Sequence, residues 1–426
     1  MLNIKKIDLL IFLLSFLIIL SFVFGFYLDE NSAGAGDSDF KLIWNNQQIF
    51  LENKIKDAIV HGGYFDSRTP ISYILHKYLN PFTNSIESFR KTVFIISSIL
   101  PIVFFFSLKK KFDTKIPLLI LLSSFILMSP FFRTTSYWGL EENYGMIFLV
   151  LTNIIILNYE KISSHLQTNY KKISSIFLIC FFSSMTFYFD QKLIIVPILS
   201  LIFILKNFEN REKLLALIIF FFFSLPYIYL IFLWGAPIAT TSSSRAFTFN
   251  WINPGYIMCI IGFYIFPFIF FKNKNLKDLK KFFLNKVNIF IILLTATYLL
   301  SFLFSHDFNN VEPTIGNGIG HKVANFFFDD ILLKKFTIIL FIFFSTLTIL
   351  FFFSTTHDRL IILFFLSLGL IVNPIYQEYF DPLIFIMLFT FFKEKIIINY
   401  RLLGVMFLYF SSILVSAIYY YRIVLY

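Results

Sequence analysis

Charged residues are scarce in this chain. Only 14% of its 426 residues are Asp, Glu, Lys or Arg, whereas 58% are hydrophobic. This balance excludes an ordinary water-soluble domain, whose surface carries far more charge. Apolar runs of about 17–22 residues recur along the chain, and backbone groups in lipid must be paired within one segment. The sequence therefore predicts an all-α, polytopic membrane protein, with residues 1–426 forming a single transmembrane domain.

Cysteine, nucleotide-binding motifs and glycosylation acceptors are also scarce or absent. Cys180 and Cys259 are the only cysteines, and both fall inside apolar runs, so they are expected to pack as small side chains without a disulfide. No GxGxxG, P-loop or HExxH motif occurs, so no soluble nucleotide-binding domain or zinc site is expected. The chain has no Asn-X-Ser/Thr sequence, which agrees with a bacterial inner membrane.

The apolar runs predict about thirteen spans, the first of them uncleaved. Most of the 36 Lys and Arg residues fall in loops on one side of these spans, so the net charge of +11 reflects membrane topology and no nucleic-acid partner is expected. The same bias places the N-terminus in the cytoplasm. No span carries a charge in its middle, which disfavours a transporter. The expected spans are 7–28, 92–108, 116–132, 144–158, 173–189, 192–205, 214–234, 255–271, 288–304, 336–353, 360–372, 382–392 and 402–421.

The first outer loop, 29–91, is the most polar stretch of the chain and contains several helix signals. Apolar positions between 40 and 59 predict an amphipathic interfacial helix, with Asp37 or Ser38 as its N-cap and Asp39 in its first turn. His61 and the two glycines after it end this helix. Thr69 is the expected N-cap of a second helix, because proline follows it. The loop is expected to form part of a site at the membrane boundary.

The second outer loop places two adjacent acids, Glu141 and Glu142, near Arg133. The acids could bind a divalent cation such as Mg²⁺ or Mn²⁺, or contact hydroxyl groups of an acceptor. The alternative is that they are solvated and paired with Arg133. Lys192, in the short outer turn after the 173–189 span, could face a phosphate or reach the lipid headgroups. Arg245 lies in a Ser/Thr-rich loop that could order over a bound lipid.

Two later segments are also rich in polar residues. The second large outer loop, 305–335, contains several glycines followed by His321 and Lys322, a composition suited to an anion such as a lipid phosphate. The segment 373–382 has polar and aromatic residues between two prolines. We expect Gln377, Glu378 and Tyr379 of this segment to line a site. The alternative is that they only form part of an aromatic belt at the membrane boundary.

The order of these parts resembles the GT-C superfamily of integral-membrane glycosyltransferases, in a layout similar to protein O-mannosyltransferases and aminoarabinose transferases. The resemblance rests on Asp37-Ser-Asp39-Phe, then His61-Gly-Gly-Tyr-Phe-Asp66, then Thr69-Pro-Ile-Ser-Tyr. It implies a catalytic carboxylate, either Asp39 or Asp37 with Asp39 preferred. It further implies that His61 and Asp66 support the site.

The resemblance implies inverting transfer of a sugar from a polyprenyl-phosphate carrier to an acceptor hydroxyl on the extracytoplasmic face. An aspartate would act as general base. The acceptor could be a lipid, a glycan or a protein. Competing hypotheses are a polysaccharide polymerase or ligase and a flippase for lipid-linked glycans. The expected donor-binding cations are Arg133, Lys192, Arg245, His321 and Lys322, and the early and late site residues are expected to converge in one pocket.

Overall fold

The computed structural model describes residues 2–66, 68–161, 169–239, 249–271, 276–305, 316–372 and 375–424. These residues form helices and no strands, which confirms the predicted all-α class. The chain divides into two compact units, and the expected single transmembrane domain stays a prediction. Unit 1 comprises Met1–Ser244, Phe410–Val424 and Tyr426, and unit 2 comprises Arg245–Tyr409 and Leu425.

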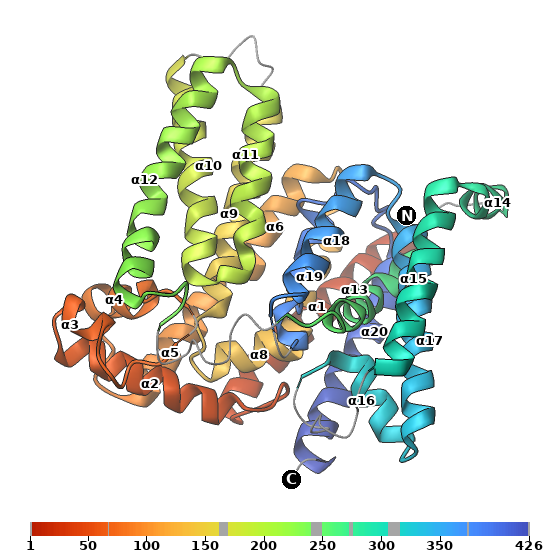
Figure 1. The fold of residues 1–426 in the computed structure, drawn as a ribbon, viewed down its shortest axis with the longest axis horizontal. Coiled ribbons are helices and arrows are strands. Elements are labelled where there is room, and N and C mark those ends of the chain that lie inside the picture. The colour runs from red at the N-terminus through yellow and green to blue at the C-terminus, as the bar shows by residue number, and fades with distance from the viewer. Residues whose placement is uncertain are drawn as a thin grey trace. The chain divides into compact units, whose positions relative to one another are not determined.

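Unit 1 contains a bundle of long apolar helices with shorter helices across one of its ends (Figure 1). Its elements are α1 (Leu2–Tyr27), α2 (Gly36–Glu52), α3 (Ile55–Ile59), α4 (Ile71–Leu79), α5 (Ile86–Ser97), α6 (Ile99–Lys111), α7 (Ile116–Ser124), η1 (Phe125–Met128), α8 (Pro130–Tyr137), α9 (Glu142–Lys161), α10 (Asn169–Phe189), η3 (Gln191–Ile194), α11 (Ile195–Asn207) and α12 (Asn210–Trp234). The short helices α2–α4 come from the first predicted outer loop.

Aromatic packing fixes these short helices to the bundle. The ring of Phe50 in α2 stacks on Tyr73 in α4 with centroids 5.4 Å apart, and Tyr64 packs edge-on against both rings. The indole Nε1 of Trp234, at the end of α12, donates to the carbonyl of Ile59 at 3.1 Å. Buried aromatic pairs of this kind add to the free energy gained from apolar burial. The first loop is therefore a folded part of unit 1.

Helix α2 begins earlier than its sequence predicts. The expected N-caps Asp37 and Ser38 lie inside the helix, and Ala35 in the left-handed region is the N-cap. The carboxamide oxygen of Asn31 accepts from the amide of Gly36 at 3.2 Å and so satisfies one of the free donors at the helix start. The N-cap prediction was wrong because a side chain five residues upstream supplies the acceptor.

The start of α4 also differs from its prediction. Thr69 does not cap this helix, since Pro70 occupies the N-cap position and Ile71 is the first helical residue. The hydroxyl of Thr69 instead donates to the carbonyl of Tyr188 at the end of α10. Thr69 thus connects the first loop to the bundle.

Unit 2 has a separate core formed by its longer helices. Its elements are α13 (Asn253–Ile269), α14 (Leu276–Leu284), α15 (Lys286–Ser305), α16 (Gly318–Phe327), α17 (Ile331–Phe352), α18 (Thr356–Gly369), η6 (Gln377–Tyr379), α19 (Leu383–Phe389) and the first half of α20 (Tyr400–Tyr419). The second half of α20 and the π-helical turn after it, η7 (Tyr420–Val424), belong to unit 1. Tyr256, Phe302, Ala324 and Ile342 bring α13, α15, α16 and α17 together in the core.

Seven helices among the described residues are long and apolar enough to cross a membrane, and the chain is an integral membrane protein. They are Lys6–Tyr27, Ile86–Lys111, Tyr170–Phe189, Asn210–Trp234, Lys286–Phe304, Ile331–Phe352 and Tyr400–Arg422. A bent pair, Ile116–Met128 and Pro130–Tyr137, would make an eighth. The remaining spans of the expected thirteen are not confirmed, and several of them correspond to short helices such as α18 and α19. Cys180 and Cys259 are buried thiols, as expected for packing residues.

Candidate functional site

Asp39 lies in the first turn of α2 with its side chain exposed. The partial positive charge of the helix N-terminus favours a carboxylate at this position. Asp37 lies in the same turn but points in a different direction, because residues two apart are not neighbours on a helix surface. Its carboxylate binds Lys41 at 2.7 Å in an exposed pair. The structure therefore separates the two aspartates that the sequence left as alternatives.

The loop between α3 and α4 carries an arginine that the sequence analysis did not single out. Asn46 of α2 holds this loop, accepting from the amide of Phe65 at 3.1 Å and donating to its carbonyl at 2.8 Å. Asp66 accepts from the backbone amide of Arg68 at 2.9 Å and from the hydroxyl of Tyr73. Asp66 is buried; one of its oxygens holds the backbone of Arg68 and the other is bonded to Tyr73.

Arg68 forms an ion pair with Glu142, the first residue of α9. Its Nη2 donates to Oε1 of Glu142 at 2.6 Å, and the two side chains are 23% and 12% exposed. Burial acts to raise the pKa of Glu142. The positive charges of Arg68 and, to a smaller extent, Lys192 outweigh this effect and hold the pKa below its ordinary value. Glu142 is therefore a carboxylate that stays ionised at neutral pH.

Asp39 is close enough to this ion pair to be affected by both charges. Partial desolvation raises the pKa of Asp39 from 3.8 to about 6. The negative charge of Glu142 is a smaller part of this rise, and the positive charge of Arg68 opposes it. Asp39 is thus an accessible carboxylate that titrates close to neutral pH, which is a property of groups that exchange protons with a substrate.

The short turn after α10 adds another pair of opposite charges. Asp190 caps η3 by accepting from the amide of Lys192 at 3.1 Å, and its other carboxylate oxygen lies 3.4 Å from the ammonium of Lys192. Burial raises the pKa of Asp190, against the attraction of Lys192. Arg68 and Glu142 also act on Asp190. We call this group the acidic cluster, consisting of Asp39, Asp66, Glu142 and Asp190 together with Arg68 and Lys192.

Glu141 has a separate environment from Glu142. Its Oε1 lies 3.1 Å from Nε2 of His76, and the two side chains are 3% and 4% exposed. The same ring nitrogen lies 3.2 Å from the hydroxyl of Tyr144, and Nδ1 lies 3.0 Å from the carboxamide of Asn80. The two adjacent acids therefore have different partners in this structure, and their predicted binding of Mg²⁺ or Mn²⁺ stays a prediction. Within the described ranges, no group of three or more His, Cys, Asp or Glu side chains is placed to hold a metal ion.

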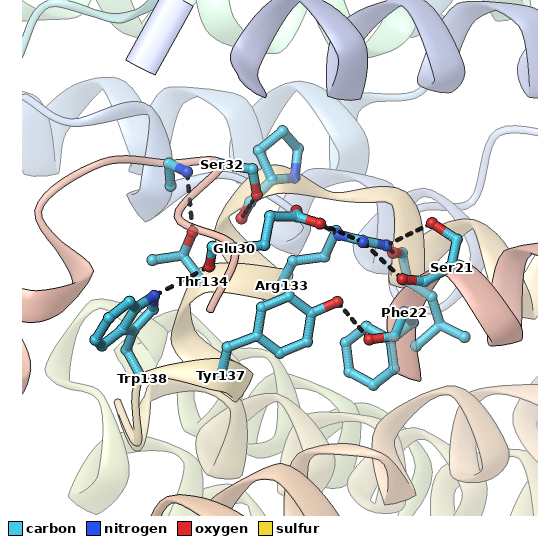
Figure 2. Close-up of polar contacts among 11 residues, drawn as sticks. Ser21, Phe22, Glu30, Ser32, Arg133, Thr134, Tyr137 and Trp138 are labelled. Carbon is cyan, nitrogen blue, oxygen red and sulfur yellow. Dashed lines mark hydrogen bonds and ion pairs between the residues drawn. The ribbon is translucent and has the colours of Figure 1, made fainter. Parts of the chain in front are cut away.

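Arg133 occupies a buried position in unit 1 (Figure 2). Its Nε and Nη2 donate to the two carboxylate oxygens of Glu30 at 2.7 and 2.5 Å. The guanidinium also donates to the carbonyls of Ser21 at 2.9 Å and Leu127 at 3.2 Å. These bonds connect α8 to the end of α1 and give Arg133 a structural role, while its expected contact with a phosphate stays a prediction. The alternative pairing of Arg133 with Glu141 and Glu142 is also wrong, since its partner is Glu30.

The late candidates lie together in unit 2. Burial lowers the pKa of Lys322, in α16, to about 8, and the negative charge of Glu378 opposes this shift. The amide of Asn317 donates to the carbonyl of Ile375 at 2.6 Å, which joins the start of α16 to the segment before η6. His321, the residue before Lys322, is buried. The start of α16 is therefore bonded to the segment 375–382, here called the Tyr-rich segment.

The rest of the Tyr-rich segment packs on α13. The buried hydroxyl of Tyr264 lies near the side chains of Asp381 and Gln377. Tyr379 packs edge-on against Tyr376 with ring centroids 5.4 Å apart. The early candidates thus gather in unit 1 and the late candidates in unit 2. Their predicted convergence in one pocket stays a prediction.

Two further candidates complete the predicted set. His61 lies on an exposed turn, where its Nδ1 accepts from the amide of Gly63 at 3.0 Å. This bond stabilises the turn that separates α3 from the loop carrying Asp66. Arg245 lies outside the described residues.

No family model, curated protein or solved structure matches this chain. Its function is therefore argued from the residues themselves. The sequence analysis missed Arg68, His76 and Asp190 as members of the polar groups. A usable signal was present for Asp190, because the turn Asp190-Gln-Lys192 is the only polar interruption between two apolar runs.

Proposed function

We propose that unit 1 carries the catalytic centre of a membrane glycosyltransferase that moves a sugar from a polyprenyl-phosphate carrier to an acceptor hydroxyl. The observation that supports this most is the position of Asp39. It is an exposed carboxylate with a pKa of about 6, beside the Arg68–Glu142 ion pair. It also lies on a helix packed across the ends of apolar helices, where a lipid-linked substrate would present its polar head.

The proposed reaction is a single displacement at the anomeric carbon. The acceptor oxygen attacks C1 of the sugar as its proton passes to the carboxylate of Asp39. The bond between C1 and the phosphate oxygen breaks, and its electron pair leaves with the polyprenyl phosphate. Attack from the face opposite the leaving group inverts the configuration at C1. Proton acceptance by a placed carboxylate typically accelerates such a step about 10²–10⁴-fold.

The leaving phosphate gains negative charge, so cations near the reacting carbon would stabilise the transition state. Arg68 and Lys192 are the cations of the acidic cluster, and they come from the first loop and from η3. The polyprenyl tail would remain among lipid chains beside the apolar helices. The proposed orientation places the N-terminus in the cytoplasm and the acidic cluster on the exterior face of a bacterial inner membrane, as the Lys and Arg distribution favours.

The test uses the full chain reconstituted in lipid vesicles with polyprenyl-phosphate sugars labelled in the sugar. We expect the wild-type protein to transfer label to an added acceptor glycan or lipid, with an inverted anomeric linkage. Asp39→Asn should reduce the rate by about 10²-fold or more. The matched control is Asp37→Asn, which removes a carboxylate from the same helical turn and should keep the rate within about twofold of wild type.

The competing functions give different outcomes in the same vesicles. A flippase would move the intact labelled donor across the bilayer and form no new glycosidic bond. A polymerase or ligase would extend or transfer a preformed lipid-linked glycan and leave single-sugar donors unused. Equal transfer rates for folded Asp39→Asn and wild-type protein would exclude Asp39 as the base.

A further inference from the structure

Helix α14 is short, amphipathic and placed beside a membrane span. It ends at Leu284, and the candidate span Lys286–Phe304 begins two residues later. Lys280 and Lys281 are exposed, and so are the apolar side chains of Phe283 (50%) and Leu284 (66%). Figure 1 shows α14 projecting from the end of α15 within unit 2. A helix that exposes both lysine and large apolar side chains next to a span suits the boundary between lipid and water.

The structure holds α14 firmly at this place. Phe282 of α14 is buried, and its ring packs edge-on against Phe351 of α17 with centroids 5.6 Å apart. The carboxamide of Asn288 donates to the carbonyl of Phe282 at 3.1 Å and accepts from Arg359 at 2.9 Å. Asn285 accepts from the first amides of α15 and so begins that helix directly after α14. The exposed side chains are therefore presented by a fixed element.

More lysines surround α14 at the same end of unit 2. Arg359 lies in the first turn of α18 beside Asp358. The buried carboxylate of Asp358 accepts from the amides of Lys393 and Glu394 at 2.8 and 2.9 Å. These bonds bring the 393–395 segment to the end of unit 2 at which α15 begins. The exposed cations at this end are Lys280, Lys281, Lys286, Lys393 and Lys395. None of them forms an ion pair with another part of the described structure.

We propose that this surface, formed by α14 and the lysines around it, binds the anionic headgroups of the surrounding bilayer. Phe283 and Leu284 would enter the boundary between headgroups and acyl chains, while the lysines contact lipid phosphates. The occupant is an anionic phospholipid rather than a soluble protein, because the exposed apolar residues continue directly into the apolar surface of α15 at Val287 and Phe290. Each lysine near an anionic surface adds roughly 1 kcal/mol of attraction. This proposal is independent of the sugar-transfer reaction.

The test is native mass spectrometry of the full chain after exchange into equal amounts of phosphatidylglycerol and phosphatidylcholine. We expect the wild-type protein to retain phosphatidylglycerol preferentially. The double variant K280E/K281E should lower that preference about fivefold or more, the factor that corresponds to roughly one lysine's attraction. Phe283→Ser should lower the retention of both lipids, since it removes apolar contact and leaves the charges in place.

The matched control is K54E/K56E, which makes the same change of charge at two exposed lysines beside α3 in unit 1. It should leave the lipid preference of wild type unchanged. An unchanged preference in K280E/K281E, or an equal loss in K54E/K56E, would overturn the proposal. Because all four lysines are exposed, circular dichroism of the two variants should match that of wild type and exclude misfolding as the cause.

Discussion

Arg68 and Glu142 are 74 residues apart in the chain and form an ion pair of 2.6 Å. The exposed carboxylate of Asp39 is affected by both of these charges, which act on its pKa in opposite directions. Desolvation is the main cause of the raised pKa of Asp39, and the two charges of the pair adjust that pKa in opposite directions. This relationship can be tested by changing each charge separately.

We expect sugar transfer to depend on pH through the ionised form of Asp39. With a pKa of about 6, the rate should rise about tenfold per pH unit below pH 6 and level off above pH 7. Glu142→Gln removes a negative charge that raises the pKa of Asp39, so the rising limb should move to lower pH. Arg68→Gln removes a positive charge that lowers this pKa, so the limb should move to higher pH.

The measurement is a pH–rate profile of each variant in the same vesicles, with Asp37→Asn as the control that should not move the limb. Shifts in opposite directions are specific to an electrostatic effect on one titrating group. Two variants that merely damaged the fold would lower the plateau without separating the limbs. A limb that stays in place in both variants would show that Asp39 does not govern the profile.

The raised pKa of Asp39 also has a consequence for stability. Between about pH 4 and pH 6, the folded state binds more protons at this site than the unfolded state, so the contribution of Asp39 to stability falls as pH rises. Above pH 6 the ionised carboxylate is a charge that the fold disfavours. We expect the Asp39→Asn variant to unfold at a temperature equal to or above that of wild type at pH 7.5. This difference in thermal midpoint should disappear near pH 4. A lower midpoint at pH 7.5 would contradict this.

The Arg133–Glu30 pair should contribute strongly to stability, because both charges are largely buried. Removing one partner leaves the other uncompensated, which typically costs about 3–5 kcal/mol. We expect Arg133→Ala and Glu30→Ala each to lower the free energy of unfolding in detergent by this amount. The double variant should lose much less than the sum, since neither charge is then left alone. Additive losses would show that the two side chains act independently.

The helical class of the protein and its polar first loop were predictable because both depend on local patterns. Long apolar runs need no partner to be recognised, and the acids of the loop stand out against an apolar background. Asp39 and Glu142 were singled out in this way. The helix start at Gly36 was not predictable, because its capping group is the side chain of Asn31, outside the helical pattern.

Charge pairing across the chain could not be predicted in the same way. Arg133 was close to Glu141 and Glu142 in sequence, but its partner Glu30 is 103 residues away. Arg68 follows Asp66 in a turn, and nothing local indicates that its guanidinium meets α9. The predicted thirteen spans are not all confirmed among the described residues, because an apolar run in the sequence does not fix the length of the helix that it forms. The helices α18 and α19 have only 14 and 7 residues.

Close helix packing in unit 2 gives a final prediction. A Cβ added to Gly262 of α13 would lie 2.5 Å from the side chain of Ser345 and 2.8 Å from its Cα, which is backbone and cannot rotate away. We expect Gly262→Ala to force α13 and α17 apart and to destabilise the protein by about 1–3 kcal/mol. The measurement is the free energy of unfolding in detergent.

Gly404 of α20 provides the matched control, because a Cβ added there meets nothing within 4 Å. The same substitution at that position should stabilise the protein by about 0.5–1 kcal/mol, since alanine loses less backbone entropy in a helix than glycine does. The two variants should therefore differ in sign. If Gly262→Ala is also stabilising, α13 and α17 do not pack as closely as the contact between Gly262 and Ser345 requires.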